Sequence, residues 1–340
     1  MRNIQSNFKV VILDDCSSCS EKIIPILERM IKKKIYFYKA SLNDVNSLEE
    51  PFKAHNFYAA IHFAGKKSVN ESIEKPLFYY DNNFIGTFNL IKMCLKYKVN
   101  NFIFSSSCTV YGNRDDKPRE DEKFLFPINP YGRSKLFIEY MLKDTAKVNK
   151  QFKVVLLRYC NPVSSHSSGL IGEDPFVNPT NLFPVIQNLI RGRIKELIIF
   201  GNDYPTKDGT CIRDYIHVTD IAQGHITVLK VFNPENEKIF KDNCVIYNMG
   251  TNRGYSVKEI VETYEKVNGI KLNYRYGNRR KGDATIALPD CNKIYKELGW
   301  MPKIGLEQMC KDSYNFINKN PKGLFKDWIK IIQLNKFKYN

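Results

Sequence analysis

The sequence contains no long uninterrupted apolar segment. Residues 1–30 hold no apolar run of signal-peptide length, and nowhere in the 340 residues do eighteen apolar residues follow one another. Secretion and membrane spanning both depend on such runs. We therefore expect a cytoplasmic protein with no membrane partner.

The cysteines also lack the pattern of a disulfide framework. Nine cysteines, an odd number, are scattered over the whole length, which argues against paired disulfides. Cys16 and Cys19 form a C-x-x-C pair, but no second pair and no nearby histidine completes a tetrahedral ligand set. From the sequence we predict no metal site.

Basic residues are in excess but are not clustered. The formal net charge is +16, from 52 Lys and Arg against 36 Asp and Glu, and this charge suits an anionic partner. No aromatic–basic module of the RNA-binding kind is present. A small anionic substrate is favoured over nucleic acid, whose signature would be an RNA affinity that falls steeply with salt.

Short β-branched and aromatic runs alternate with longer amphipathic stretches. Helical spacing occurs near residues 21–31, 83–97 and 131–147. Strands are predicted at 10–13, 35–38, 59–63, 102–106, 154–159 and 245–248. This alternation indicates an α/β fold with a doubly wound, Rossmann-like parallel sheet, which binds ligands beyond the carboxyl ends of its strands. After about residue 160, a loop-rich segment (161–181) predicts a smaller second domain.

Tyr131 and Lys135 are the strongest candidates for catalytic chemistry. A spacing of four residues places both on one face of the predicted helix. The lysine charge would favour the phenolate and lower the pKa of Tyr131 toward neutrality, as a general base for a hydroxyl group requires. Because Y-x-x-x-K also arises by chance on solvated helices, the pair alone does not decide the function.

A cluster of serines precedes this pair in the sequence. Ser107 follows the predicted strand 102–106, where its hydroxyl would hydrogen-bond the oxygen that Tyr131 deprotonates. The serines could instead only cap a turn. Strand, serine cluster and Tyr/Lys helix, in this order, form the arrangement of short-chain dehydrogenases.

From about Val10 to about residue 325 the chain resembles UDP-glucose 4-epimerases, which are extended short-chain dehydrogenases/reductases. The resemblance rests on an ordered series of segments: 61–65, 79–83 with 86–87, 104–112, 157–163, 172–175, 181–182, 200–210 running into 213–218, and 279–283. It implies an isomerase of galactose metabolism that acts on UDP-sugars and commonly forms a homodimer.

The resemblance implies NAD as the cofactor, bound by residues 1–163. Residues 164–340 would mainly bind the UDP-sugar, with a segment near 213–250 returning to the first domain. Asp14 would accept hydrogen bonds from the adenosine ribose, with Asp15 beside it, and a carboxylate there would repel the 2′-phosphate of NADP. The other cofactor-binding residues implied are Phe63, Ala64, Gly65, Lys67, Asn83, Ser105, Tyr131, Lys135 and Tyr159.

The resemblance also implies the catalytic roles. Tyr131 would take the proton of the sugar 4-hydroxyl while C4 passes its hydride to NAD, Ser107 would hydrogen-bond the oxygen, and Lys135 would hold the tyrosine pKa. The 4-keto sugar would then turn over, and the hydride would return to its other face.

The resemblance implies the substrate-binding residues in the same way. Arg213 and Arg280 would face the diphosphate, because guanidinium forks match phosphate oxygens. Ala287 stands where some family members have Tyr, and it would leave room for an N-acetyl group. The full implied set is Ser107, Tyr131, Asn161, Asn181, Leu182, Phe200, Arg213, Arg280, Asp283 and Ala287.

The chain departs from the family on the cofactor side. In the family, a first strand and a G-x-x-G-x-x-G turn precede the strand that ends in the ribose carboxylate, but the thirteen residues before Asp14 contain no glycine. That unit would present N–H groups to the pyrophosphate and supply a central strand. We expect either an incomplete sequence, the favoured interpretation, or a truncated protein with impaired cofactor binding. The residues Ser18, Cys19 and Ser41 also differ from those usual near the adenosine.

Two other functions stay open. A nucleotide-sugar 4,6-dehydratase would need an acidic pair at the serine cluster, and residues 105–109 offer none. A catalytically silent nucleotide-sugar-binding homologue is favoured by the missing glycine turn and opposed by the presence of Ser107, Tyr131 and Lys135.

Overall fold

Four parallel strands form the central sheet. The computed structural model describes residues 8–114, 116–175, 179–280 and 283–324. The strands β3 (Ala60–His62), β4 (Asn101–Ser107), β5 (Lys153–Tyr159) and β9 (Cys244–Met249) lie in the order β3-β4-β5-β9. Their register places Ser107 of β4 beside Tyr159 of β5, so the two side chains share the edge at which ligands are expected.

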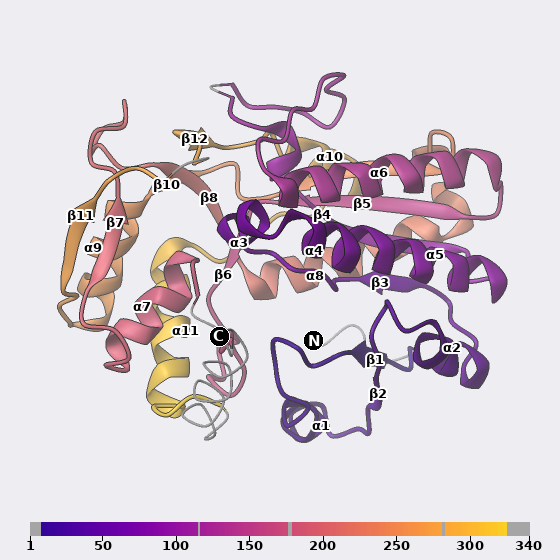
Figure 1. Cartoon of the computed structure of the whole chain (residues 1–340), viewed down its shortest axis with the longest axis horizontal. Helices are drawn as coiled ribbons and strands as arrows, with labels where there is room; N and C mark the ends of the chain where they lie inside the picture. The colour runs from indigo at the N-terminus through magenta and orange to yellow at the C-terminus, as the bar shows by residue number, and fades with distance from the viewer. Residues whose placement is uncertain (1–7, 115, 176–178, 281–282, 325–340) are drawn as a thin grey trace.

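Helices cover this sheet on both faces (Figure 1). On one side, Phe102, Phe104 and Leu156 pack against α5 (Gly86–Lys96) and α6 (Pro130–Val148). On the other side, the alternate residues Ile103 and Val155 pack against α8 (Val218–Leu229). A strand buried on both faces reads as a continuous apolar run, and the predicted doubly wound architecture is confirmed.

Before α5, the chain makes the short helices α3 (Val69–Glu74) and α4 (Pro76–Tyr79) and a π-helical turn, η1 (Tyr80–Ile85). The turn η1 runs directly into α5 and contacts α6. Asn83 lies in η1 and is buried, so this irregular turn brings a polar side chain toward the sheet.

The strands β1 (Val11–Asp14) and β2 (Tyr36–Lys39) form a separate parallel pair, flanked by α1 (Ile23–Ile31) and α2 (Val45–Ala54). Among the described strands, none pairs with both β1 and β3. The two sheets therefore stay distinct, and Figure 1 shows the β1–β2 pair below β3.

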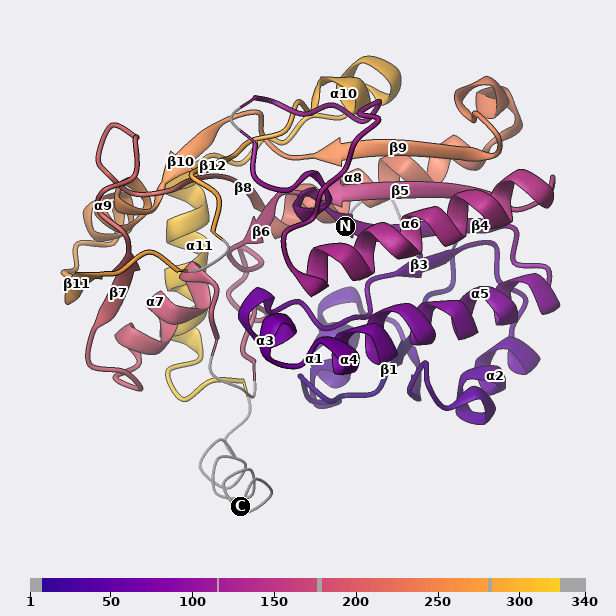
Figure 2. The ribbon, with the colours of Figure 1, turned by 45° about the horizontal axis from the view of Figure 1, so that its top comes forward.

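The rest of the chain builds a second region around another core. The strand β8 (Ile212–His217) pairs with β6 (Asn161–Val163), β10 (Gly254–Ser256) and β12 (Ile286–Ala287). A second pair joins β7 (Leu197–Phe200) to β11 (Tyr274–Gly277). The second core packs side chains of α7 (Leu182–Ile190), α9 (Val257–Asn268) and α11 (Leu306–Lys319) together, and Figure 2 shows these helices beside the central sheet. Short elements complete the described chain: η2 (Cys108–Tyr111), η3 (Lys230–Phe232), η4 (Pro234–Ile239) and α10 (Asn292–Leu298).

All six predicted strands are present, with ends within about two residues of the expected ones. The three predicted helices correspond to α1, to η1 with α5, and to α6. None of the helices in the described ranges is long and apolar enough to cross a membrane.

Candidate active site

Tyr131 and Lys135 lie one turn apart at the start of α6. Asn129 caps this helix by accepting a hydrogen bond from the backbone N–H of Gly132 at 2.8 Å, and Pro130 occupies the first turn. The Lys135 Nζ atom stands 5.9 Å from the centroid of the Tyr131 ring. The expected shared face is therefore present in the structure.

Ser107 reaches the same place from the end of β4. Its Oγ accepts hydrogen bonds from the N–H and the hydroxyl of Thr109, at 3.2 Å and 2.9 Å, so it does cap the turn into η2. It also lies close enough to the phenol of Tyr131 to lower its pKa. The turn-capping and functional interpretations of Ser107 are compatible, and the structure brings Ser107, Tyr131 and Lys135 together.

The pKa of Tyr131 differs from the expectation. Burial raises it above its ordinary value, and the nearby Ser107 hydroxyl only partly offsets this. Lys135 is itself buried, which lowers its pKa to about 8, and its Nζ donates to the carbonyl of Ser105 at 2.8 Å. The expected lowering of the tyrosine pKa by Lys135 is not found for the protein alone, because burial of the phenol is the largest effect and raises the pKa.

Ser105, Tyr159 and His225 form a hydrogen-bonded row behind this group. The Nδ1 atom of His225 lies 2.8 Å from the carbonyl of Ile221, and a carbonyl only accepts, so Nδ1 carries the proton. Burial lowers the pKa of His225; the neutral ring then accepts at Nε2 from the Tyr159 hydroxyl at 2.5 Å. The Ser105 hydroxyl, 3.0 Å from that of Tyr159, donates to it. The ring of Tyr159 is thereby fixed at the end of β5.

The segment after β3 is held by Asn83. Its Oδ1 accepts from the N–H of Lys66 at 2.7 Å, and its Nδ2 donates to the carbonyl of Lys66 at 3.0 Å. Gly65 adopts φ +149°, and a Cβ there would stand 3.1 Å from Asn83 Oδ1 and 3.7 Å from Lys135 Nζ. A side chain at position 65 would therefore crowd the space between Asn83 and Lys135.

The remaining predicted cofactor-side residues are spread over two elements. The exposed Phe63 ring lies 4.8 Å from the His225 ring, Ala64 follows it at the surface, and Lys67 pairs with Glu173. Asp14 ends β1 and Asp15 follows it; their carboxylates accept hydrogen bonds from the N–H groups of Cys16 and Ser17, respectively. These two carboxylates belong to the separate β1–β2 pair.

A second cluster gathers most of the predicted substrate residues. The Asp283 carboxylate pairs with Arg280 at 2.9 Å and with Arg213 at 3.8 Å. The Arg280 guanidinium lies 4.9 Å from the ring centroid of Phe200. Ala287 of β12 is the register partner of Arg213 on β8, so it lies beside this arginine pair.

The other predicted substrate residues lie at element ends. Asn181 precedes α7 with an exposed side chain that makes no capping bond, and Arg280 donates to the neighbouring carbonyl of Thr180. Leu182 packs partly into the second core. Asn161 is exposed on β6 and is the register partner of Tyr215 on β8.

With this geometry in place, comparison with known proteins identifies the family. The family model described as GDP-mannose 4,6 dehydratase matches residues 4–313. "UDP-glucose 4-epimerase 1" of Oryza sativa subsp. japonica is 44% identical over 323 residues, which cover 94% of this chain and 90% of the relative. The chain belongs to the UDP-glucose 4-epimerase family.

Solved structures of UDP-glucose 4-epimerases agree with the fold. The enzyme of Bifidobacterium longum, solved with NAD+ and UDP, superposes with a TM-score of 0.88 at 39% identity, over 94% of each chain. The UDP-Glc/GlcNAc 4-epimerase of Campylobacter jejuni superposes with a TM-score of 0.77 at 35% identity, over 94% of each chain. The predicted resemblance of this chain to UDP-glucose 4-epimerases is confirmed.

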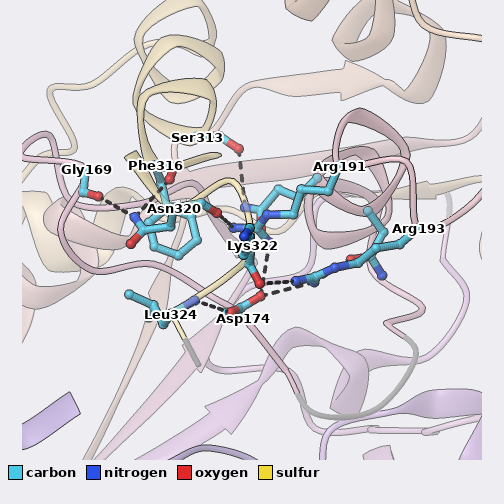
Figure 3. Close-up of polar contacts among 11 residues, drawn as sticks. Gly169, Asp174, Arg191, Arg193, Ser313, Phe316, Asn320, Lys322 and Leu324 are labelled. Carbon is cyan, nitrogen blue, oxygen red and sulfur yellow. Dashed lines mark hydrogen bonds and ion pairs between the residues drawn. The ribbon is translucent and has the colours of Figure 1, made fainter. Parts of the chain in front are cut away.

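A buried ion-pair network anchors the 172–175 segment of this epimerase-family chain (Figure 3). The Asp174 carboxylate accepts from Arg191 at 3.0 Å, from Arg193 at 3.4 Å and from the N–H of Leu324 at 2.7 Å. Arg191 also donates to the carbonyl of Asn320. Asp174 thus fastens the start of the segment that leads to Asn181 onto the chain that follows α11.

Sequence reasoning missed two residues of this epimerase site. His225 lies on α8, 66 positions from Tyr159, and nothing in its local sequence points to the tyrosine. Asp174 lies in a segment that carried the family resemblance, but only its burial and its arginine partners show the anchoring. An acidic residue in a segment that the family shares was the available signal.

Proposed function

We propose that this chain is an NAD-dependent 4-epimerase that interconverts UDP-glucose and UDP-galactose in the cytoplasm. The observation that carries the proposal is that Ser107, at the carboxyl end of β4, lies close to Tyr131 and Lys135, at the start of α6. The relatives of this chain are named UDP-glucose 4-epimerases.

The residues at this edge fit a nicotinamide dinucleotide. Gly65 keeps the backbone beside Asn83 and Lys135 free of a side chain, and the Lys135 ammonium has three donors, one of which goes to Ser105. Asp14 offers a carboxylate at a strand end, the group that suits ribose hydroxyls. When bound, NAD would supply the hydride acceptor and donor for C4 of the sugar.

The protein side chains then handle the proton. Tyr131 takes it from the 4-hydroxyl as general base, and Ser107, which lies beside the Tyr131 phenol, also contacts the reacting oxygen. The charged Lys135 favours the phenolate form of Tyr131. Because the tyrosine pKa is raised by burial, this assistance from Lys135 is needed at neutral pH.

The arginine pair fits the UDP diphosphate. Arg213 and Arg280 share Asp283, so a carboxylate already holds both guanidinium groups close to one another. Ala287, beside Arg213, leaves space at the sugar's C2 substituent, so we include UDP-N-acetylglucosamine and UDP-N-acetylgalactosamine among the substrates. The Campylobacter jejuni relative is named for both sugar types.

Two alternatives have less support. The matching family model is described as a dehydratase, but the buried carboxylate nearest the serine cluster, Glu139, accepts from Ser106 and pairs with Arg158, so it is committed to the scaffold. A catalytically silent binding protein would have no need of the Ser107, Tyr131 and Lys135 arrangement.

We also propose that the chain forms a homodimer through α4, η1, α5 and α6. These elements expose several large apolar side chains: Leu77, Phe78, Ile85, Phe88, Phe137, Tyr140 and Val148. Large exposed apolar patches are rare on monomeric proteins, and a second copy would cover these side chains by isologous helix packing. Sedimentation of Phe88→Asp with Phe137→Asp should give a monomer where the parent gives a dimer.

The proposed activity is tested by following the conversion of UDP-galactose to UDP-glucose by the purified chain with added NAD. Turnover that is lost in Tyr131→Phe, with UDP binding retained, would support the epimerase. Release of water with formation of a 4-keto-6-deoxy sugar would instead support the dehydratase, and UDP-sugar binding without turnover would support the silent protein.

A further inference from the structure

The loop between β1 and α1 folds two thiols back onto Asp14. Cys16 adopts a left-handed backbone conformation, φ 55°, and its N–H donates to Asp14 Oδ1 at 2.7 Å. The turn brings Cys19 Sγ to 3.7 Å from the same oxygen. One oxygen of Asp14 and the sulfur atoms of Cys16 and Cys19 all lie within 4.8 Å of one another.

The separation of Cys19 Sγ from Asp14 Oδ1 can be compared with the ligand spacing around a small thiophilic cation. With Zn–S bonds of about 2.3 Å and Zn–O bonds of about 2.1 Å, neighbouring ligand atoms of a tetrahedral site stand about 3.6–3.8 Å apart. The 3.7 Å from Cys19 Sγ to Asp14 Oδ1 falls in this range. Two thiolates and one carboxylate would occupy three positions and leave the fourth for water.

Charges of both signs lie around the loop. Asp14 and Glu21 are negative and Lys39 is positive near Cys16, and Lys66 donates to Ser17 Oγ in the same loop. Binding of a divalent cation would release the protons of both thiols.

We propose that Asp14, Cys16 and Cys19 bind a thiophilic divalent cation such as Zn²⁺. The prediction of no metal site considered only cysteine and histidine ligands, and Asp14 becomes apparent as a third ligand only when the loop is folded. Both sulfur atoms are only half-buried, so a cation in solution can reach them.

A second group of possible ligands, Cys160, Asp214 and Cys291, is less suited to a cation. The Asp214 carboxylate already accepts from the N–H and hydroxyl of Thr251 and from the N–H of Asn252. A Cβ at Gly250 would stand 2.4 Å from Cys160 Sγ, so backbone packs directly against this sulfur. This group serves as the control for the proposal.

The cation site has a consequence that rests on the proposed function. Asp14 is the carboxylate predicted to bind the adenosine ribose, and a cation bound to it would neutralise its charge and occupy lone pairs that those hydrogen bonds would use. Cation and NAD would therefore compete, and each would weaken the other's apparent affinity by the same factor.

The site is tested by titrating the purified, reduced chain with Co²⁺ and with Zn²⁺ against a chromogenic chelator. We expect one equivalent of Co²⁺ with a thiolate-to-cobalt charge-transfer band. Cys16→Ser and Cys19→Ser should each weaken binding at least tenfold, while Cys291→Ser should leave it unchanged. Binding that survives in the Cys16→Ser/Cys19→Ser double variant, or that is lost in Cys291→Ser, would overturn the proposal.

A second measurement needs no variant. Zn²⁺ should slow iodoacetamide labelling of Cys16 and Cys19 in the parent chain, as mapped on peptides, by at least tenfold; unchanged labelling overturns the site. NAD at ten times its dissociation constant should raise the apparent Zn²⁺ dissociation constant about tenfold. An unchanged value would refute the shared role of Asp14 while leaving the cation site standing, and failure of the chain to bind NAD without metal would count against the proposed function only.

Discussion

The β1–β2 unit and the central sheet contain the same strand–helix motif but differ in burial. Helix α6 buries eight of its residues, and the middle of β5 is fully buried. Helix α1 buries none, and all four residues of β1 are only partly buried. An apolar strand becomes core only when neighbours cover both of its faces, so the motif alone does not set its stability. Chemistry that needs fixed geometry lies on the central sheet, and the carboxylates proposed for the ribose lie on the less buried unit.

The largest expected effect isolates chemistry on the central sheet. Tyr131→Phe removes the proposed base while keeping the ring, so turnover should fall at least ~10²-fold, and UDP affinity should change little because Arg213 and Arg280 are untouched. Steady-state kinetics and calorimetric UDP titration measure the two quantities. Activity within threefold of the parent would discard Tyr131 as the base.

The difference in burial between the two units predicts that shortening a leucine side chain costs more stability in β5 than in β1. Leu156→Ala in β5, where the side chain is fully buried, should destabilise the protein by about 2–5 kcal/mol, whereas Leu13→Ala in β1, partly buried, should cost about 1 kcal/mol. Thermal melts of both variants, with hydrogen exchange resolved by peptide, give the comparison. Equal costs would contradict the contrast drawn between the two units.

Lys135, the buried lysine of the candidate active site, should lower the free energy of unfolding. The pKa of Lys135 is about 8 in the folded protein against an ordinary 10.5. Between these values the unfolded chain binds a proton that the folded protein has lost, so stability should rise with pH from about 8 to about 10.5. Lys135→Met should raise the free energy of unfolding at pH 7 by about 1–3 kcal/mol and remove this rise, while turnover falls. Melting temperatures of the parent and of Lys135→Met between pH 7 and 10.5 test this prediction. A parallel pH dependence in the two proteins would contradict a destabilising role of Lys135.

The smallest effect concerns substrate breadth. Ala287→Tyr should suppress the interconversion of the N-acetyl sugars about tenfold or more by overpacking the space beside the C2 substituent, and should change the glucose–galactose reaction little. Both reactions are measured in parent and variant. Absence of N-acetyl turnover in the parent would contradict the proposal that Ala287 leaves room for an N-acetyl group, because neighbouring loops or Leu288 would then fill the space.

Local patterns predicted the central sheet and the proposed catalytic group well. The spacing of Tyr131 and Lys135 and the run before Ser107 fix their places within one strand and one helix. The expected lowering of the Tyr131 pKa is opposed by burial, which depends on what packs around α6. The His225–Tyr159 bond and the Asp174 network join positions far apart in sequence, and the approach of Asp14 to Cys19 depends on the left-handed turn at Cys16. No local pattern carries these contacts.

The π-helical turn η1 has a consequence for how this chain tolerates insertions and deletions. A π turn holds one more residue than an α turn, and removing one residue from η1 would merge α4 and α5 into a regular helix while rotating one side by about 100°. Asn83 would then leave Lys66, and the segment after β3 would lose its anchor. We expect single substitutions at exposed positions of η1 to leave the fold of this segment intact, whereas any change in the length of η1 should disrupt it. The extra residue of η1 therefore constrains the lengths of the neighbouring helices more strongly than their sequences.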